Sequence, residues 1–555
     1  MSSYNLESLK LPKLTGNLLS IFANLIETPF GKLLLLNSLL ENGGIPKLRG
    51  LNVEDVPTFY PLVQPEGDRE QPERLSEPNA SAWNLPYPTS LDYSQKYQNG
   101  DITPIEVAEQ VLRNIKSSEQ GDQPLRAFIA LNRDDLFSQA EAATQRIKTG
   151  HRLSPLDGVP VAIKDEIDML PYPTTVGTAF LGKQPALEDS TVAARLRAAG
   201  ALLVGKTNMH EIGIAPNGMN VHHGTVRNPF DRTHDTGGSS SGSAAAVSAG
   251  IVPVAIGADG GGSIRIPATL CGVIGLKPTF GRVSEFGAAP LCWSVAHLGP
   301  LAASVYDAAL VYSIIAGPDP RDSNSMLQPA VTLKGWNTPD LSGLRFGIYP
   351  EWNEHADVDV VLVFKEMLSN LEKRGATIIE IEIPELDEMR ISHAITILSE
   401  MAMCMRVYKS QRKEMAEAAR LSLVLGEEMS SNDYIQAQRY RTRALATFER
   451  LYSEVDVILS PGTAKPAQAF PLANPTQGWS DLSIDTEYMR YVYIGNLTGL
   501  PAISFPAGYD SNGLPIGMQA MGNHWQEHLL LRVAYNAEQV LERRAPANFY
   551  PSLIL

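Results

Sequence analysis

The stretch VPVAIGADGGGSIRIPATLCGV, residues 252–273, decides the fold class of this chain. Its apolar run at 252–256 predicts a buried strand, the glycines at 260–262 a tight turn, and the residues from Ile264 onward a helix. The same alternation occurs upstream, with strands at 159–163 and 201–204 and helices at 191–199 and 244–249. Strands that alternate with helices predict a layered α/β core.

The second half of the chain continues this pattern. Two further strands are predicted at 344–349 and 455–459, with a long amphipathic helix at 358–374 between them. Near the C-terminus, segments 502–505 and 515–519 predict a β-hairpin, because an Asn-Gly pair lies between them.

Composition narrows the class of protein. The chain has 555 residues, 44% of them hydrophobic and 19% charged, which is typical of a globular protein. Its formal net charge of -15 disfavours direct binding of nucleic acid. The 3 cysteines are odd in number and lack CxxC spacing, so they encode neither a disulfide framework nor a zinc site. We therefore expect an intracellular, reduced protein.

Residues 1–50 predict an amphipathic helical hairpin. Pro29 separates two apolar segments, and Gly43-Gly44 ends the second. Polar and charged residues interrupt the apolar run at 18–40, so it is typical of neither a membrane-spanning helix nor a signal peptide. The hairpin would cap the core of its own chain, contact a second copy, or rest in a membrane interface.

Residues 51–100 read as a proline-rich connector without hydrophobic periodicity. Regular structure is expected to resume at the tetrad TPIE, residues 103–106. This tetrad is a capping box with proline at the first helical position.

The first candidate catalytic residue is the lysine that closes the strand in DGVPVAIK, residues 157–164. Burial disfavours a charged ammonium, so the pKa of Lys164 is expected below its ordinary value of about 10.4. Such a lysine can act as a general base. Alternatively, Lys164 extends to solvent or pairs with Asp165 or Glu166.

The second feature is the run TGGSSSGSAAAV, residues 236–247. A Gly/Ser run is usually a linker, but this one leads directly into a helix-forming alanine run. It lacks the Gly-Lys-[Ser/Thr] of a phosphate-binding loop. It also contains G-x-S-x-G centred on Ser240, yet the preceding residues 227–234 are polar and broken by proline. A nucleophile elbow needs a hydrophobic strand there, so that interpretation fails.

The third feature is the glycine turn itself. Gly260, Gly261 and Gly262 before Ser263 allow several backbone N–H groups to point at one spot, which is how an oxyanion hole beside a nucleophile is built. The alternative is a tight turn in which Ser263 caps the following helix. The adjacent His222 and His223 lack further ligands at metal-site spacing, so no metal and no cofactor are expected.

Together, Lys164, GGSSSGSAAA from Gly237 and DGGGSIRIPA from Asp259 resemble the amidase signature family. The resemblance covers roughly residues 101–522, including NLTGLPA at 496–502, and implies a large twisted mixed β-sheet covered by helices. It implies Ser263 as nucleophile, Ser239 as bridging serine and Lys164 as base. The backbone at Gly260, Gly261, Gly262 and Ser263 would then hold the oxyanion. Gly260 departs from the threonine or isoleucine common in the family.

Within that family, LKLPKLTG at 9–16 and IPELDEMR at 383–390 resemble the plant-type fatty acid amide hydrolases. This implies long-chain acyl amides such as N-acylethanolamines as substrates and a catalytic domain at 101–555. It also implies a homodimer and a hairpin cap at a membrane-facing entrance through residues 18–40, in a cytoplasmic or peripherally membrane-associated enzyme. Two alternatives are a glutamine amidotransferase subunit that works with a partner on charged tRNA, and a short-chain amidase of the same family.

Overall fold

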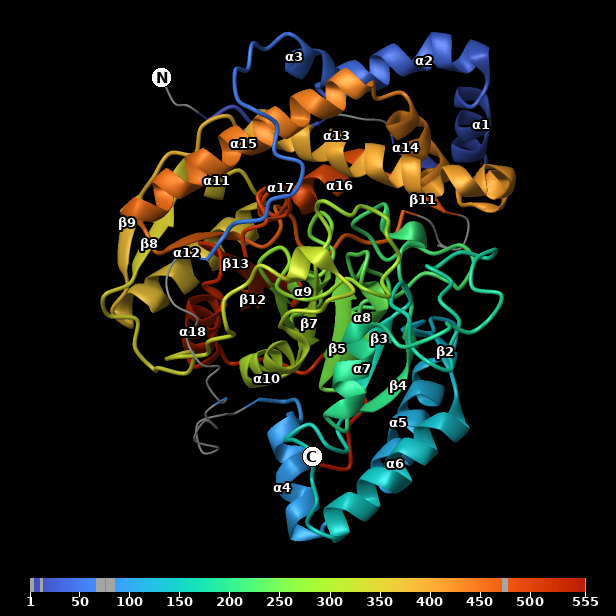
Figure 1. Ribbon diagram of the computed structural model, residues 1–555, viewed down its shortest axis with the longest axis vertical. Coiled ribbons are helices and arrows are strands. Elements are labelled where there is room, and N and C mark those ends of the chain that lie inside the picture. The colour runs from blue at the N-terminus through green and yellow to red at the C-terminus, as the bar shows by residue number, and fades with distance from the viewer. Residues whose placement is uncertain (1–3, 10–12, 66–74, 76–84, 472–477, 555) are drawn as a thin grey trace.

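A mixed β-sheet forms the centre of the computed structural model, which describes residues 4–9, 13–65, 75, 85–471 and 478–554. Within these residues the sheet has 11 strands in the order β2-β4-β3-β5-β7-β6-β12-β13-β10-β8-β9 (Figure 1). Neighbours β3, β4 and β5 are parallel, whereas β5 and β7 are antiparallel. The expected α/β class with a large mixed sheet is therefore confirmed.

The strands have the following bounds: β1 Leu14–Thr15, β2 Phe128–Leu131, β3 Pro160–Lys164, β4 Leu202–Thr207, β5 Val254–Ala258, β6 Ile274–Lys277, β7 Leu298–Ala302, β8 Arg345–Ile348, β9 Thr377–Glu380, β10 Val457–Pro461, β11 Trp479–Ser480, β12 Ala502–Tyr509 and β13 Pro515–Gly522. The predicted strands at 159–163, 201–204 and 252–256 correspond to β3, β4 and β5. The predicted C-terminal hairpin is the antiparallel pair β12 and β13.

The α-helices have the following bounds: α1 Gly16–Ile26, α2 Pro29–Asn42, α3 Ile45–Arg49, α4 Ser90–Asn99, α5 Pro104–Ser118, α6 Arg133–Lys148, α7 Thr191–Ala198, α8 Ser241–Ser248, α9 Arg265–Cys271, α10 Val305–Ile315, α11 Pro350–Asn353, α12 Val358–Lys373, α13 Leu386–Met405, α14 Glu417–Glu427, α15 Ser431–Glu454, α16 Leu482–Met489, α17 Tyr493–Leu497 and α18 Glu527–Glu538. Short 3-10 turns occupy Glu211–Gly213, Ser323–Ser325 and Arg406–Glu414.

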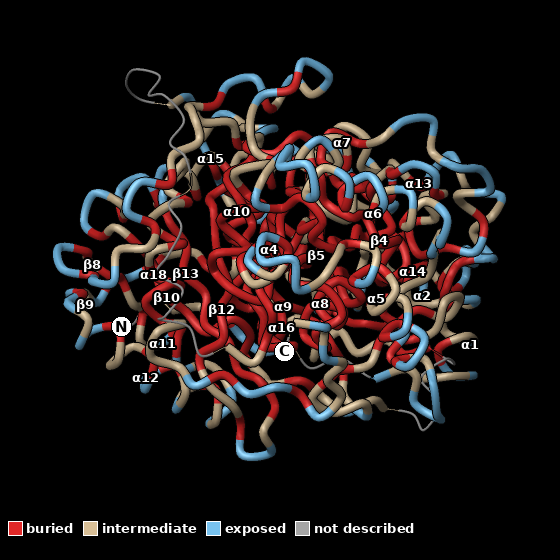
Figure 2. Tube along the Cα trace, turned by 90° about the horizontal axis from the view of Figure 1, so that it is seen from below, coloured by how far each residue is buried: buried red, intermediate tan, exposed pale blue. Residues whose placement is uncertain are grey.

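The strands β3 and β5 are buried throughout, because both of their faces are covered by helices. Helix α8 contacts β3 and β5, and α9 contacts β6, β12 and β13. Helices α7, α10, α18 and α12 contact one another in series and also contact the sheet. The buried residues drawn in red in Figure 2 accordingly gather around β5, α8 and α9.

The N-terminal residues form the expected pair of helices, α1 and α2, followed by the short α3. The axes of α1 and α2 meet at a bend of 106°. Leu19, Ala23 and Ile26 of α1 pack on Leu421 and Val424 of α14. The two helices lie beside α13 and α14 at the upper right of Figure 1.

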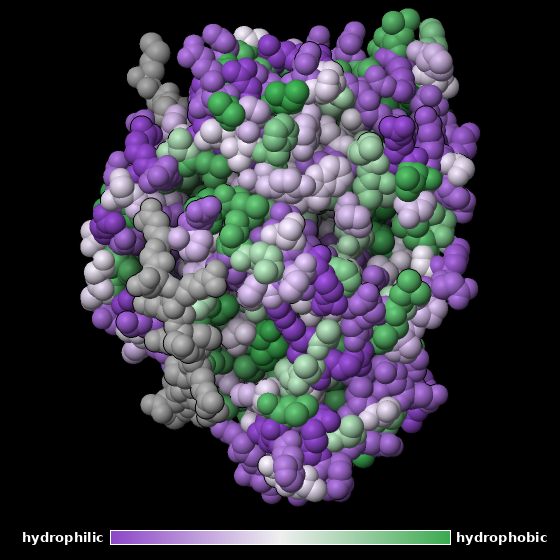
Figure 3. All heavy atoms as spheres, in the orientation of Figure 1, coloured by the Kyte–Doolittle hydropathy of each residue, from purple (hydrophilic) through white to green (hydrophobic). Residues whose placement is uncertain are grey.

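The opposite side of the same hairpin carries apolar side chains that the protein leaves in solvent. These are Leu18, Ile21, Phe30, Leu33 and Leu34, each more than half exposed. Hydrophobic residues are visible at the top right of Figure 3, where α2 lies in Figure 1. In the described part of the chain, no single helix is long and apolar enough to cross a membrane, although α1 and α2 together pass that test by length and composition.

The segment at 51–100 differs from the expected connector in its last ten residues. Helix α4 begins after Thr89, which forms a capping box with Asp92. Tyr93 and Tyr97 of this helix are buried, and the Tyr97 hydroxyl donates to Gly158 O at 2.7 Å. Regular structure thus resumes before Thr103, because the capping box and two buried tyrosines compensate for a polar helix.

Candidate active site

The carboxyl ends of two neighbouring parallel strands bring the first candidate residues together. Lys164 is the last residue of β3, and Ala258 is the last residue of β5. Because β3 and β5 pair in parallel, the two strands end at the same edge of the sheet. The glycine turn that starts at Asp259 therefore begins beside the lysine.

The side chain of Lys164 lies at the centre of this edge, and the residue is only 1% exposed. Its Nζ donates to Ser239 Oγ at 2.8 Å and to Ala258 O at 3.2 Å. The same nitrogen lies 3.0 Å from Glu166 Oε2. Lys164 thus contacts Ser239 and also pairs with Glu166, while the neighbouring Asp165 pairs with Lys206 at 3.5 Å. The alternative in which Lys164 extends to solvent is wrong.

The serine run places each hydroxyl differently. Ser239 follows a cis peptide bond and is 2% exposed, with its Oγ facing Lys164. Ser240 is fully buried and donates from Oγ to Ala258 O at 3.2 Å. Ser243, in helix α8, donates to Ile256 O at 3.0 Å. Ser240 and Ser243 therefore attach the run to β5, which keeps Ser239 at the end of that strand.

Ser263 lies next to the serine run, because the Ser240 backbone N–H donates to Ser263 O at 3.2 Å. Helix α9 has Ile264 at its N-cap and no side-chain cap, so Ser263 does not serve as the helix cap. Within the described residues the structure gives the Ser263 hydroxyl no hydrogen-bond partner, and no bond joins it to Ser239. The structure brings the backbones of the two serines together and leaves the Ser263 hydroxyl unpaired.

The glycine turn is held from inside by Asp259, a residue that the sequence did not single out. Its carboxylate accepts the Gly262 N–H at 2.6 Å and the Ile264 N–H at 3.1 Å. The Gly262 N–H is therefore already paired. Within the described chain, no acceptor is found for the N–H groups of Gly260, Gly261 and Ser263, so these three are the donors available to an oxyanion.

Asp259 is in turn fixed by Arg265 and Asn496, all three being fully buried. Arg265 Nε and Nη2 both donate to the Asp259 carboxylate at 3.0 Å, and Asn496 Nδ2 donates to it at 2.9 Å. Burial alone would raise the pKa of this carboxyl, but the charge and hydrogen bonds of Arg265 hold it well below its usual range. Asp259 consequently remains ionised, and the turn keeps its shape.

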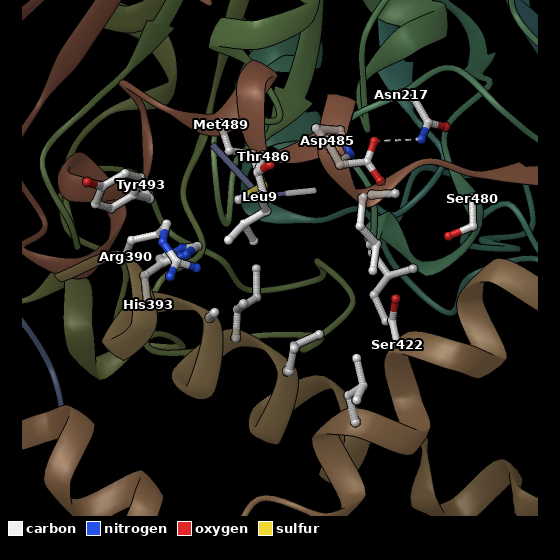
Figure 4. A pocket seen from close by; sticks show the side chains of 18 of the residues that line it. Leu9, Asn217, Arg390, His393, Ser422, Ser480, Asp485, Thr486, Met489 and Tyr493 are labelled. Carbon is white, nitrogen blue, oxygen red and sulfur yellow. Dashed lines mark hydrogen bonds between the residues drawn. The ribbon is translucent and has the colours of Figure 1, made fainter. Parts of the chain in front are cut away.

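A pocket near the glycine turn encloses about 1230 Å³ of space, part of it open to solvent, and its described lining includes neither the turn nor Lys164 or Ser239. Helices α13, α14 and α16, the loop at 214–217 and the N-terminal Leu6 and Leu9 form its walls (Figure 4). His393 and Met489 connect it to the turn, because a Cβ on Gly261 would come within 2.9 Å and 3.0 Å of them. The lining of α13 and α14 is largely apolar: Ala394, Ile397, Leu398, Met401, Ala418 and Leu425.

Two buried histidines at the pocket have contacts that the sequence did not predict. His393 Nε2 lies 2.8 Å from Gly260 O, and His210 donates its backbone N–H to Ser239 O at 3.2 Å. Burial lowers the pKa of each to about 4, so both are neutral at physiological pH. Because Gly260 O can only accept, His393 carries its proton on Nε2. No local motif marks His393, which lies 133 residues from Gly260 in the sequence.

Known proteins are similar to this chain in sequence and in fold. A family model described as Amidase matches residues 106–531. A fatty acid amide hydrolase of Oryza sativa subsp. indica is 38% identical over 588 aligned residues, covering 99% of this chain and 96% of that protein. A glutamyl-tRNA(Gln) amidotransferase subunit of a Cyanothece strain is 36% identical over 460 residues, covering 78% of this chain and 94% of its own. The peptide amidase of Stenotrophomonas maltophilia superposes with a TM-score of 0.69 at 27% identity, covering 82% of this chain and 98% of that one.

The chain therefore belongs to the amidase signature family. It is an amide-hydrolysing enzyme, and it is similar to plant fatty acid amide hydrolases along nearly its whole length.

Proposed function

We propose that this enzyme is a serine hydrolase that cleaves fatty acid amides, such as N-acylethanolamines, through a Ser-Ser-Lys triad. The observation that carries the proposal is the 2.8 Å contact between Lys164 Nζ and Ser239 Oγ, beside a glycine turn with free N–H donors. A lysine amine can serve as base to a serine hydroxyl, and one serine can pass a proton for another.

In the first half of the reaction, Lys164 Nζ accepts the proton of Ser239 while Ser239 accepts that of Ser263. Ser263 Oγ forms a bond to the amide carbon, and the carbonyl electron pair moves onto oxygen, where the N–H groups of Gly260, Gly261 and Ser263 hold it. The C–N bond then breaks as the proton returns through Ser239 to the leaving nitrogen. The products of this half are a free amine and an acyl-enzyme on Ser263.

Water completes the cycle. Lys164, through Ser239, takes a proton from water as its oxygen attacks the acyl carbon, and the bond to Ser263 Oγ breaks. The proton returns to Ser263, which leaves a free fatty acid and the starting enzyme. The contact between Lys164 Nζ and Ser239 Oγ supports the first link of this relay, and the backbone bond from Ser240 to Ser263 supports the second.

The apolar wall of the pocket supports the proposal that the substrate carries a long acyl chain. Apolar side chains of α13 and α14 line one wall of the pocket (Figure 4). Burial of apolar area is favourable by about 25 cal/mol per Å², so each added methylene should strengthen binding. The similarity to fatty acid amide hydrolases supports the same substrate class.

A hydrolysis panel tests this function. The purified enzyme is given acetamide, glutamine and N-acylethanolamines of increasing chain length, and kcat/KM should rise with chain length. Fastest turnover of acetamide would favour the short-chain amidase. Ammonia release from glutamine together with a copurifying subunit would favour the tRNA amidotransferase. Labelling by a fluorophosphonate probe should disappear in Ser263→Ala, and persistence of the label would contradict the assigned nucleophile.

The exposed apolar side of α1 and α2 supports a contact with a membrane interface or with a second copy of the chain. Phe30→Glu and Leu33→Glu together should weaken whichever contact this side makes. Sedimentation with phosphatidylcholine vesicles reports membrane contact, and the mass in solution reports dimerisation. Unchanged results in both measurements would contradict both assignments.

A further inference from the structure

The charged side chains around the pocket differ in whether a group of opposite charge pairs with them. Arg390 pairs with Asp387 at 2.7 Å, and Arg490 pairs with Glu487 at 2.5 Å. Both arginines therefore already have a carboxylate partner. A carboxylate on a bound molecule would have to compete with these pairs, which disfavours acidic substrates at this wall.

Asp485 has no such partner of opposite charge among the described residues. It lies on α16, 9% exposed, and its Oδ1 accepts a hydrogen bond from Asn217 Nδ2 at 3.2 Å (Figure 4). Among the described residues no cation pairs with it, and its second carboxylate oxygen has no partner. Burial raises the pKa of Asp485 to about 7, with the Asn217 hydrogen bond acting in the opposite direction. The pocket thus contains a carboxyl group that is under-bonded in either protonation state.

The position of Asp485 relative to the reacting groups follows from two contacts. Met489 lies on the same face of α16, four residues or about 6 Å along the helix, and its Cε abuts Gly261. On the other side, the backbone of Asn217 lies so close to Gly238 that a Cβ there would meet Asn217 O at 2.1 Å. Asp485 therefore lies one helical turn from Met489, whose side chain reaches the glycine turn, and its hydrogen-bond partner Asn217 contacts Gly238, the residue before Ser239.

The proposed relay assigns this side to the leaving amine, because Ser239 returns the proton to the amide nitrogen. With the amine on this side, the groups beyond its nitrogen would face Asn217, whose backbone contacts Gly238 and whose side chain bonds Asp485. His210 lies on the same wall and donates from Nδ1 to Glu211 O at 3.0 Å. Its Nε2 is consequently an acceptor, and this atom is buried without a partner in the described protein. The wall therefore has two unsatisfied groups that can accept a hydrogen bond.

We propose that Asp485 is a specificity-determining residue that selects amides whose amine portion carries a hydroxyl group. A hydroxyl can donate to a carboxylate or accept from a protonated carboxyl, so it fits Asp485 in both states. An ammonium group fits only the ionised state and would be costly to bury here. This inference rests on the proposed hydrolysis of long-chain amides and adds the chemistry of the head group.

The test compares N-(2-hydroxyethyl)palmitamide with N-propylpalmitamide, which have the same acyl chain and differ by replacement of the hydroxyl with a methyl group. We expect the enzyme to favour the hydroxyethyl amide about tenfold in kcat/KM, the size of one good hydrogen bond. In Asp485→Ala this ratio should fall close to one, because the hydroxyethyl amide should lose more kcat/KM than the propyl amide. Asp485→Asn should keep part of the preference. Glu366→Gln, which removes one charge from the exposed surface of α12, is the matched control and should leave the ratio unchanged.

The outcomes separate this inference from the function on which it rests. If neither palmitamide is hydrolysed, the proposed substrate class fails and the inference fails with it. If both are hydrolysed and the ratio is the same in the wild-type protein and Asp485→Ala, the hydrolase remains and the role of Asp485 is wrong. Equal loss of both substrates in Asp485→Ala and Asp485→Asn would also contradict selection and would show a structural role.

Discussion

Lys164 is the residue whose proposed role separates two kinds of substrate. An amide nitrogen must be protonated before it leaves, whereas an ester oxygen leaves more readily without a proton. Lys164→Ala should therefore reduce amide turnover by about 10²–10⁴, the usual range for a lost acid–base group, and ester turnover by clearly less. The measurement is kcat on an amide and an ester of the same acyl chain. Equal losses on the two substrates would contradict the relay through Ser239.

Gly260 offers a second prediction at the scale of single residues. A Cβ at this position would lie 2.6 Å from Cys292 Sγ, closer than atoms can pack. Gly260→Ala should thus displace the turn and lower kcat/KM by about tenfold or more, as misplacement of an oxyanion donor does. Cys292→Ala removes the sulfur, so the double variant should recover most of the activity. A double variant as impaired as Gly260→Ala would show that the small side chain is needed for another reason.

At the scale of secondary-structure elements, α4 shows how local signals and tertiary contacts combine. Thr89 accepts the Asp92 N–H at 3.3 Å and donates to the Asp92 carboxylate at 2.7 Å. Thr89→Ala should lower the free energy of unfolding by about 0.5–2 kcal/mol, the usual cost of losing an N-cap. Denaturant unfolding measures the change. Michaelis parameters at 25 °C should stay constant, since α4 is remote from the pocket, and a changed KM would contradict this separation.

The elements also show what sequence alone can predict. The strands β3, β4 and β5 are continuous apolar runs, and Gly200 closes the helix before β4, so their positions were predictable. The long helices α13 and α15 were not predicted. Buried residues lie on several sides of α13, which leaves no clear amphipathic stripe. The capping box of Ser430 and Asp433 at α15 was a usable signal.

The residues of the candidate site also differ in whether the sequence alone could predict them. Lys164, Ser239 and Ser263 lie in local motifs that the sequence alone identifies. Each motif is a lysine, a serine run or a glycine turn beside a buried strand. Asp259 lies in the same motif, but its partner Asn496 comes from a distant segment. His393 and Asp485 act across the pocket from helices outside the motifs. Such residues require the tertiary structure, since nothing in their sequence neighbours distinguishes them.

At the scale of the whole molecule, buried titratable groups predict how stability depends on pH. Burial lowers the pKa of His210, His393 and His524 to about 4, so the unfolded chain binds more protons than the folded one between about pH 4 and 6.5. The contribution of these histidines to the free energy of unfolding therefore rises with pH through this range. Burial raises the pKa of Asp307 to about 6 and of Asp485 to about 7. At these acids the folded chain binds more protons than the unfolded chain above about pH 4. Their contribution to the free energy of unfolding therefore falls as the pH rises toward 7.

The buried Asp235 and Glu538 act in the same direction as Asp307 and Asp485, because burial raises their pKa to about 6 and about 7. The slopes of the acids and of the histidines therefore oppose each other. The contribution of one acid is measured by thermal unfolding of a variant and of the wild-type protein between pH 5 and pH 8.5. Asp485→Asn removes one buried acid and should be more stable than the wild-type protein at pH 8.5, with a smaller difference at pH 5. A difference that is independent of pH would contradict the raised pKa of Asp485 in the folded protein.

The parallel pairing of β3 with β5 has a consequence for how such an enzyme can diversify. The proposed reactive groups, from Lys164 to Ser263, all lie within about one fifth of the chain, at one sheet edge fixed by Asp259 and Ser240. The opposite walls of the pocket come from α13, α14 and α16, which contribute no atom to the relay. Mutation can therefore remodel those helices, and with them the range of molecules accepted, while the bond-breaking chemistry is inherited unchanged.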